Sequence, residues 1–217
     1  MQPTPTPIIF LHGWGTTSQS FAPISKFFQN TCKCIFVEFD CNPKCVMTLD
    51  DYVDIVEQKL IDEKVTTCHV IGHSFGCRVA VLLARRNPHM IRKMVLTGAA
   101  GLRPRFNIKT WSKIKLYKMF KVGKGSTDYQ KLSPTGKKTF KNIIHRNLAQ
   151  EIYGLKTPTL LIYGKKDTAT PIYMARKWAK LQGNTATLKI YPKAGHYAFI
   201  DAPQRFITDA YAFLEAK

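Results

Sequence analysis

The pentapeptide Gly72-His73-Ser74-Phe75-Gly76 places a serine hydroxyl between two glycines, with apolar stretches at 68–71 before it and 79–84 after it. This order predicts a strand, a sharp turn and a helix. The serine is expected at the turn, in a strained backbone conformation that costs on the order of 1–3 kcal/mol. Side chains at positions 72 and 76 would collide with the neighbouring strand and helix, and glycine avoids both collisions. The pattern is typical of a nucleophilic serine.

A serine hydroxyl is a poor nucleophile near neutral pH, so it needs a general base, and the base needs an orienting group. Beyond Ser74, Asp167 follows the apolar stretch 159–163, and His196 follows the stretch 187–191. We predict that His196 takes the proton of Ser74 and later delivers it to the leaving group. Asp167 is expected to hold the tautomer of His196 and to stabilise its imidazolium form. The chain order serine, acid, histidine is one of the known orders of this triad.

Other histidines and acids are weaker candidates for these roles. His73 is expected to pack beside the turn, and His12 to make structural hydrogen bonds. Asp201 is close to His196 in sequence, so its reach to the far ring nitrogen is doubtful and a turn or cap role is expected. The remaining candidates have no partner pattern or lie in a basic stretch: His69, His89, His145 and Asp128.

Attack on a carbonyl creates an oxyanion, which backbone N–H groups can stabilise. The first donor is predicted to be the N–H of Phe75, directly after the serine. The second is expected from the loop His12-Gly13-Trp14-Gly15 that follows the first apolar stretch. Glycines on both sides let this backbone approach a substrate oxygen, so the N–H of Trp14 is the predicted second donor.

Short apolar stretches that alternate with helical patterns are expected to position these groups. The strand-like stretches are 8–11, 34–39, 69–71, 94–97, 159–163 and 187–191. Helical patterns cover 76–86, 171–181, 203–214 and a segment that starts at Thr48 with a capping-box pattern in which Asp51 replaces the usual Glu or Gln. The alternation predicts an α/β fold with a mostly parallel central sheet of about six strands and helices on both faces.

One segment, 101–157, interrupts this alternation and concentrates positive charge. It contains 14 Lys or Arg against two acids, which is +12 of the total formal charge of +19. We predict that residues 1–100 and 158–217 form two parts of one core, and that residues 101–157 form a basic helical cap.

Six cysteines lie in the first eighty residues, among them Cys32, Cys34, Cys41 and Cys45. Their spacing lacks the paired C-x2-C pattern of structural zinc sites. We expect Cys32 and Cys34 in a strand and Cys68 and Cys77 as small core residues on either side of the serine motif, with a metal or disulfide role as the alternative. The apolar run 8–11 is too short for a signal peptide or a membrane span. A cytoplasmic protein without a transmembrane segment is expected.

Taken in order, HGWG at 12–15, GHSFG at 72–76, YGKKD at 163–167 with Thr170-Pro171, and GH at 195–196 resemble the α/β-hydrolase superfamily. The usual amino-terminal hairpin of that superfamily is not apparent here. The resemblance implies a serine hydrolase that cleaves a small carboxylic ester through an acyl-enzyme, with a cap lining the acyl or alcohol pocket. A serine at position 74 disfavours epoxide hydrolases and dehalogenases, whose nucleophile is Asp. No metal or organic cofactor is implied.

Two alternatives concern the basic cap. The HGWG and GHSFG pair with such a cap also resembles esterases of pimeloyl-carrier-protein methyl esters, which implies an ester or thioester on an acidic carrier protein, docked near Lys137, Lys138 and Lys141. An anionic membrane surface is a related partner. The second alternative is a non-catalytic ligand- or nucleic-acid-binding protein. The aromatic residues of the cap favour nucleic acid, and the retained triad disfavours it. The sequence leaves acyl specificity and oligomeric state open.

Overall fold

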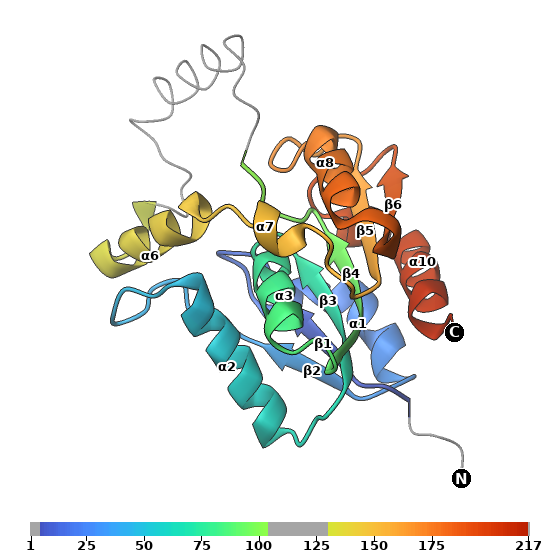
Figure 1. Ribbon diagram of the computed structural model, residues 1–217, viewed down its shortest axis with the longest axis horizontal. Helices are drawn as coiled ribbons and strands as arrows, with labels where there is room; N and C mark the ends of the chain where they lie inside the picture. Colours follow the sequence, from blue (N-terminus) through green and yellow to red (C-terminus); the bar gives the residue numbers. More distant parts are fainter. Residues whose placement is uncertain (1–4, 104–129, 217) are drawn as a thin grey trace.

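The computed structural model describes residues 5–103 and 130–216, and its centre is one parallel sheet (Figure 1). The strand order is β2-β1-β3-β4-β5-β6, and every neighbouring pair is parallel. The strands are β1 (Ile8–Leu11), β2 (Cys34–Val37), β3 (Cys68–His73), β4 (Ile91–Thr97), β5 (Thr159–Gly164) and β6 (Ala186–Tyr191). The predicted α/β fold with about six strands is confirmed.

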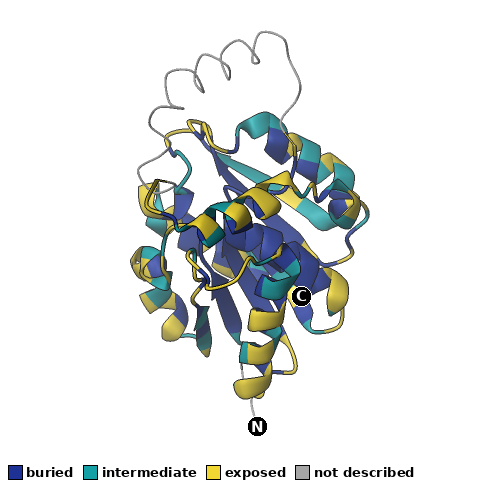
Figure 2. Ribbon diagram, turned by 90° about the vertical axis from the view of Figure 1, so that its left-hand side faces the viewer, coloured by how far each residue is buried: buried dark blue, intermediate teal, exposed yellow. Residues whose placement is uncertain are grey.

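Helices cover both faces of the sheet, and Figure 2 shows the central strands buried between them. One hydrophobic core lies under α2 (Leu49–Asp62), α3 (Phe75–Arg86) and α8 (Ile172–Gln182). The other lies under α1 (Ala22–Gln29), α9 (Ala198–Asp201) and α10 (Pro203–Glu215). Short 3-10 turns, η1 (Ser18–Phe21) and η2 (Gly183–Thr185), precede α1 and β6. Because helices cover both faces of the sheet, side chains on both sides of each strand are buried. This explains why the strands are continuous apolar runs in the sequence and not alternating patterns.

Local sequence signals set several element ends. Thr48 and Asp51 form the predicted capping box at the start of α2, with the Asp51 N–H donating to Thr48 Oγ1 at 3.3 Å and the Thr48 N–H donating to Asp51 Oδ2 at 2.6 Å. Strand β4 begins at Ile91, before the predicted residue 94. Arg92 and Lys93 interrupt the apolar run, and the register of the pairing with β3 shifts there, between Cys68 and Val70. Lys93 Nζ donates to the carbonyls of Phe213 and Leu214 at the end of α10.

The described part of the predicted cap contains α6 (Pro134–His145) and α7 (Ala149–Ile152). The side chain of Ser133 accepts the N–H of Gly136 at 3.0 Å, and Pro134 follows at the first helical position, where a missing N–H costs nothing. Residues 104–129 of the predicted cap, including most of its aromatic residues, lie outside the described residues. The cap boundaries at 101 and 157 therefore stay a prediction. No helix in the described ranges is both long and apolar enough to cross a membrane.

Candidate active site

Ser74 lies at the turn between β3 and α3, where the carboxyl end of a strand meets a helix start. Its backbone has φ +50° and ψ −105°, and Lys64 is the only other described residue besides glycine with a positive φ. A left-handed φ costs energy for a residue with a Cβ, so surrounding packing must hold it. The strained turn predicted from the sequence is present.

The glycine at position 76 is required by a backbone contact. A Cβ on Gly76 would lie 2.0 Å from the carbonyl oxygen of Leu11 in β1. At Gly72 the fit is tight rather than impossible, since a Cβ would lie 3.2 Å from Leu96 Cδ2 and 3.3 Å from the Cys77 nitrogen. The neighbouring strands and the helix therefore explain both glycines, as the sequence predicted.

Asp167 and His196 are hydrogen-bonded to each other, Nδ1 to Oδ2, at 2.9 Å. The other acceptor positions of Asp167 receive the N–H groups of Ala169 and Thr170, both at 2.8 Å, and the Thr170 hydroxyl at 2.7 Å. Burial alone would raise the pKa of Asp167, but the hydrogen bonds from His196 and Thr170 outweigh it and hold the pKa below its usual value. The carboxylate is ionised and can only accept. His196 Nδ1 is therefore the donor, and Nε2 keeps its lone pair.

Backbone hydrogen bonds hold the loops that carry these two residues together. The N–H of Lys165 donates to Tyr191 O at 2.8 Å, and the N–H of Lys166 donates to Ala194 O at 2.9 Å. Asp201 accepts the N–H of Gly195 at 2.7 Å, which is the turn role predicted for it. The pairing of acid and histidine therefore rests on the β5–β6 strand pair and its two loops.

His196 lies beside the turn that carries Ser74. Its ring centroid is 4.8 Å from that of His73. At the end of β4, a Cβ on Gly98 would lie 3.0 Å from His196 Nδ1 and Cε1. Within residues 5–103 and 130–216 the Ser74 hydroxyl makes no hydrogen bond, so the structure joins acid to histidine and places the serine next to them without a bond. Such contacts are often long in the absence of substrate.

His73 does more than the packing expected of it. Its Nε2 lies 3.3 Å from the carbonyl oxygen of His196 and can donate to it. Burial, followed by the nearby charge of His196, lowers the pKa of His73 to about 3, so its ring is neutral at physiological pH. We missed this contact because the two residues are 123 positions apart in the chain, and no local pattern predicts it.

The two predicted oxyanion donors come from neighbouring loops. Ser74 is the N-cap of α3, so the Phe75 N–H is the first of the helix amides that have no partner within the helix. Strand β1 pairs Leu11 with Gly72, and the rings of Trp14 and Phe75 pack edge to face at 5.3 Å. Donation from Trp14 and Phe75 to a substrate stays a prediction.

His12 braces the loop that carries Trp14. Its Nε2 accepts the N–H of Phe39 at 2.9 Å, and its Nδ1 lies 2.8 Å from the carbonyl oxygen of Gly13. The structural role predicted for His12 is confirmed. Burial lowers the pKa of this histidine, against weaker opposing effects of Gly13 and Glu38.

Comparison with known proteins identifies the family of this chain. A model of the alpha/beta hydrolase family matches residues 8–210. The chain belongs to this family.

Relatives of the chain include plant and bacterial proteins. The chain is 32% identical to strigolactone esterase RMS3 of Pisum sativum, over 46% of this chain and 39% of that relative, so it spans well under half the length of that protein. It is 24% identical to the protein named "Putative esterase/lipase 2" of Mycoplasma genitalium, over 95% of this chain and 88% of that protein.

Solved structures with the same fold cover nearly the whole chain. Carboxylesterase CesB (YbfK) from Bacillus subtilis superposes with a TM-score of 0.73 at 16% identity, over 99% of this chain and 85% of that chain. A membrane phospholipase A gives a TM-score of 0.81 at 17% identity, over 99% of this chain and 80% of that chain.

In this alpha/beta hydrolase, α6 forms a wall next to the Trp14 loop. The ring of Phe140 packs 5.5 Å from that of Trp14, and Thr139 Oγ1 accepts the N–H of Met47 at 3.0 Å. Arg78 of α3 is only 7% exposed and donates to the carbonyls of Ile143 and Arg146, both at 2.9 Å. The cap helix is thus tied to the helix that begins at Ser74.

Arg78 has no acidic partner among the described residues, which is unusual for a buried guanidinium. Burial lowers its pKa to about 10, so it stays charged near neutral pH. The two carbonyls lie at the end of α6, where the helix dipole is negative, and this compensates part of the cost of burial. No local pattern in the sequence marks Arg78 as an anchor, so its role could not be predicted.

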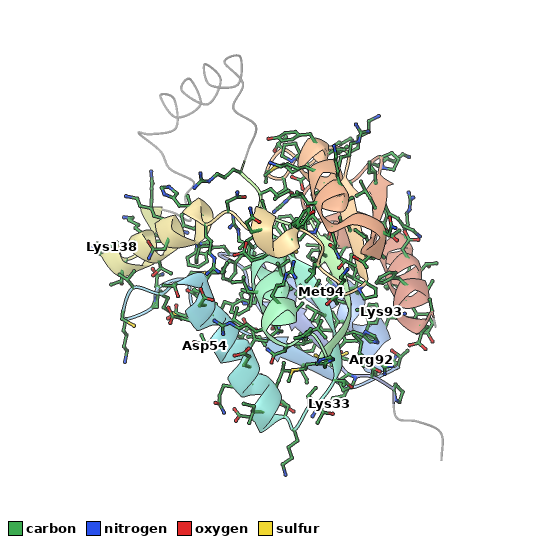
Figure 3. All side chains as sticks on the ribbon, in the orientation of Figure 1. Lys33, Asp54, Arg92, Lys93, Met94 and Lys138 are labelled. Carbon is green, nitrogen blue, oxygen red and sulfur yellow. The ribbon has the colours of Figure 1, made fainter. Side chains whose placement is uncertain are left out.

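Exposed lysines surround this end of the sheet. Lys138 and Lys141 lie on α6, and Figure 3 shows Lys138 on the outer side of that helix. Lys165, Lys166 and Lys193 lie on the exposed parts of the loops that carry Asp167 and His196. In the described ranges no group of three or more histidine, cysteine, aspartate or glutamate side chains could hold a metal ion.

Proposed function

We propose that this protein hydrolyses small carboxylic esters through an acyl-enzyme on Ser74, with His196 as general base and acid and Asp167 as its orienting partner. The observation that carries the proposal is the 2.9 Å hydrogen bond between His196 and an ionised Asp167, held beside a serine in a strained strand-to-helix turn. Family membership and relatives named as esterases support an esterase-like hydrolase function.

In the first half of the reaction, Ser74 Oγ attacks the ester carbonyl while its proton moves to His196 Nε2. Asp167 accepts from Nδ1 and stabilises the imidazolium that forms. The negative charge on the carbonyl oxygen is stabilised by the N–H groups of Phe75 and Trp14. His196 then protonates the leaving alcohol, and the acyl group remains on Ser74.

In the second half, water attacks the acyl-enzyme, and His196 takes a proton from it. The tetrahedral intermediate collapses, Ser74 receives the proton from His196, and the acid is released. His73 supports this cycle from the other side, because a neutral ring bonded to the His196 carbonyl positions the base without competing for the proton.

The test is the reaction of short p-nitrophenyl esters and of a fluorophosphonate probe with the wild type and with Ser74→Ala. Hydrolysis and labelling are expected in the wild type and should both be lost in Ser74→Ala. The matched control is Ser25→Ala on α1, which should keep both. A folded wild type that neither turns over an ester nor takes up the probe would contradict the proposal.

A second candidate substrate is an acyl group carried by an acidic protein, as ester or thioester. Exposed Lys138 and Lys141 on the cap helix, next to Lys165, Lys166 and Lys193, favour it. The double variant Lys138→Glu/Lys141→Glu should weaken use of a carrier-bound ester and spare a free ester. Lys26→Glu, on an exposed position of α1, is the control. Equal effects on both substrates would exclude docking at this surface.

A further inference from the structure

Cys32 and Cys34 form a thiol pair at the amino end of the sheet, away from Ser74. Cys34 is the first residue of β2, which is the edge strand, and Cys32 lies two positions earlier in the chain. Both residues are half-buried, and the Cys34 thiol donates to the carbonyl oxygen of Cys32 at 3.7 Å. Cys32 lies in the bend that leads into β2, so the Cys34 thiol lies against the backbone of Cys32.

Cys32 adjoins a small cavity of about 90 Å³. Its lining includes Cys32, Phe28, Thr31 and His69. Ile8 of β1 pairs with Cys34 on one side and with His69 of β3 on the other, so these three side chains lie in one row across the same face of the sheet. The cavity therefore lies between Cys32 and His69, and Cys34 belongs to the same row of side chains as His69.

His69 has an unmet hydrogen-bonding group in this cavity wall. The residue is 7% exposed, and its Nδ1 has no hydrogen-bond partner within the described ranges. Burial, followed by the positive charges of Lys93 and Arg92, lowers the pKa of His69 to about 4, so the ring is neutral. Figure 3 shows Arg92 and Lys93 at the end of the molecule where β4 begins. A buried polar atom without a partner indicates that a small polar molecule can bind in the cavity.

Cys32 differs from the other cysteines in its chemistry. The neighbouring Cys34 thiol lowers the pKa of Cys32 to about 7, whereas the neighbouring Cys32 raises the pKa of Cys34. Burial raises the pKa of Cys68 to about 12 and also raises that of Cys77. Burial also raises the pKa of Cys41, although its sulfur accepts the N–H of Gly15 at 3.1 Å. The thiolate is the nucleophile in thiol chemistry, so Cys32 is the reactive member.

We propose that Cys32 and Cys34 are a redox modification site for small hydroperoxides that bind in the cavity beside His69. The Cys32 thiolate attacks one peroxide oxygen, the O–O bond breaks, and the second oxygen leaves as alkoxide or hydroxide and takes up a proton. Sulfur is oxidised to the sulfenic acid and the peroxide is reduced. The Cys34 thiol then attacks the Cys32 sulfur, forms a disulfide and releases water.

Trypsin allows a direct readout, because it cleaves after Lys33, between the two cysteines. The full-length protein is treated with hydrogen peroxide or tert-butyl hydroperoxide, the remaining thiols are blocked with N-ethylmaleimide, and unreduced peptides are analysed by mass spectrometry. A disulfide-linked pair of peptides 27–33 and 34–44 is expected, and dithiothreitol should remove it. Cys32 should be consumed at least tenfold faster than the exposed Cys45.

Variants separate the steps of the reaction. Peptide 34–44 also contains Cys41, so Cys41→Ser must keep the linked pair and Cys34→Ser must abolish it. In Cys34→Ser the reaction should stop at a Cys32 sulfenic acid, which dimedone traps, and Cys32→Ser should show neither product. His69→Phe fills the cavity and should slow the oxidation of Cys32. Thermal unfolding of each variant verifies that it is folded.

Ser74→Ala should oxidise like the wild type, so this site and the proposed esterase function can fail independently. Oxidation of Cys45 or Cys41 as fast as Cys32, or a disulfide only between two molecules, would overturn the proposal.

Discussion

The two ends of the parallel sheet differ in how they use charge and backbone. At the carboxyl ends of the strands, helix starts and tight loops bring Ser74, Asp167 and His196 close together, and a strained backbone is held there. At the amino ends, helices finish and basic residues gather. Basic residues occupy the last turns of α1, α2, α3 and α8, and Lys93 caps α10.

The difference follows from the direction of the helices. Every strand-to-helix connection in a parallel sheet places the positive end of a helix dipole at one edge and the negative end at the other. Negative charge that develops during ester hydrolysis is therefore stabilised near Ser74, whereas lysines and arginines are stabilised at the opposite edge. Part of the large positive charge of this chain thus has a structural role that needs no partner.

The largest effect is expected at the carboxyl ends of the strands, for the variant Asp167→Asn. An amide cannot hold the Nδ1–H tautomer of His196 as the carboxylate does, so kcat for a short ester should fall by about 10⁴-fold. Asp209→Asn is the matched control. Asp209 is also a hydrogen-bonded carboxylate, but it accepts hydrogen bonds from Tyr191 and Lys189 and not from His196. It should keep kcat within twofold. A small loss for Asp167→Asn would remove Asp167 from the proposed triad.

Gly76→Ala tests how closely the strand-to-helix turn around Ser74, called the elbow below, packs on β1. The new methyl group would overlap the Leu11 carbonyl, so we expect a loss of about 3 kcal/mol in the free energy of unfolding. Gly154→Ala is the control: its φ is +63° with nothing within 4 Å of a Cβ, and the expected cost is about 1 kcal/mol. Denaturant unfolding of both variants measures the difference in the free energy of unfolding. Equal losses would show that the overlap with the Leu11 carbonyl does not determine the cost of the substitution.

Arg78 and Arg85 provide the next test, since both lie on α3 and each donates to two backbone carbonyls of the 143–153 segment. Arg78 is buried and Arg85 is exposed. Arg78→Met should cost about 2 kcal/mol, because two carbonyls lose a charged donor. It should also raise KM more than it lowers kcat, through a displaced α6 wall. Arg85→Met should change stability by about 0.5 kcal/mol or less. Similar losses for the two variants would show that burial does not matter here.

The last test concerns the pH dependence of stability set by His69 and His73 at opposite ends of β3. Both are neutral when folded, with pKa values lowered to about 4 and about 3 by burial first and then by nearby positive charge. The unfolded chain binds protons below a pH of about 6.5, so stability is full above that pH and falls as the pH drops. The expected slope is about 1.4 kcal/mol per pH unit for each histidine. For His69 the fall should end near pH 4, and for His73 near pH 3.

Denaturant unfolding between pH 4.5 and 7 measures this slope for the wild type, His69→Gln and His73→Gln. In each variant, the part of the fall in stability with decreasing pH that the two histidines cause together should be about halved. An unchanged slope in His69→Gln would show that His69 is not held neutral in the folded protein.

Several features could be predicted from short stretches of sequence because local physics requires them. Apolar runs alternating with helical patterns require a sheet covered on both faces. The glycines around Ser74 are required by contacts that any elbow of this kind makes, and Thr48 with Asp51 forms the capping box within one turn. Asp201 was placed correctly at its turn for the same reason.

Other features depend on residues far apart in the chain, and local patterns carry no information about them. The contact of His73 with the His196 carbonyl and the anchoring of α6 by Arg78 join segments that meet only after the sheet has formed. The amino acids alone therefore determined the layers, the elbow and the candidate residues, because these follow from periodicity and steric limits. Tertiary structure alone decided which buried polar groups meet, because a hydrogen bond depends on distances that only the packed chain sets.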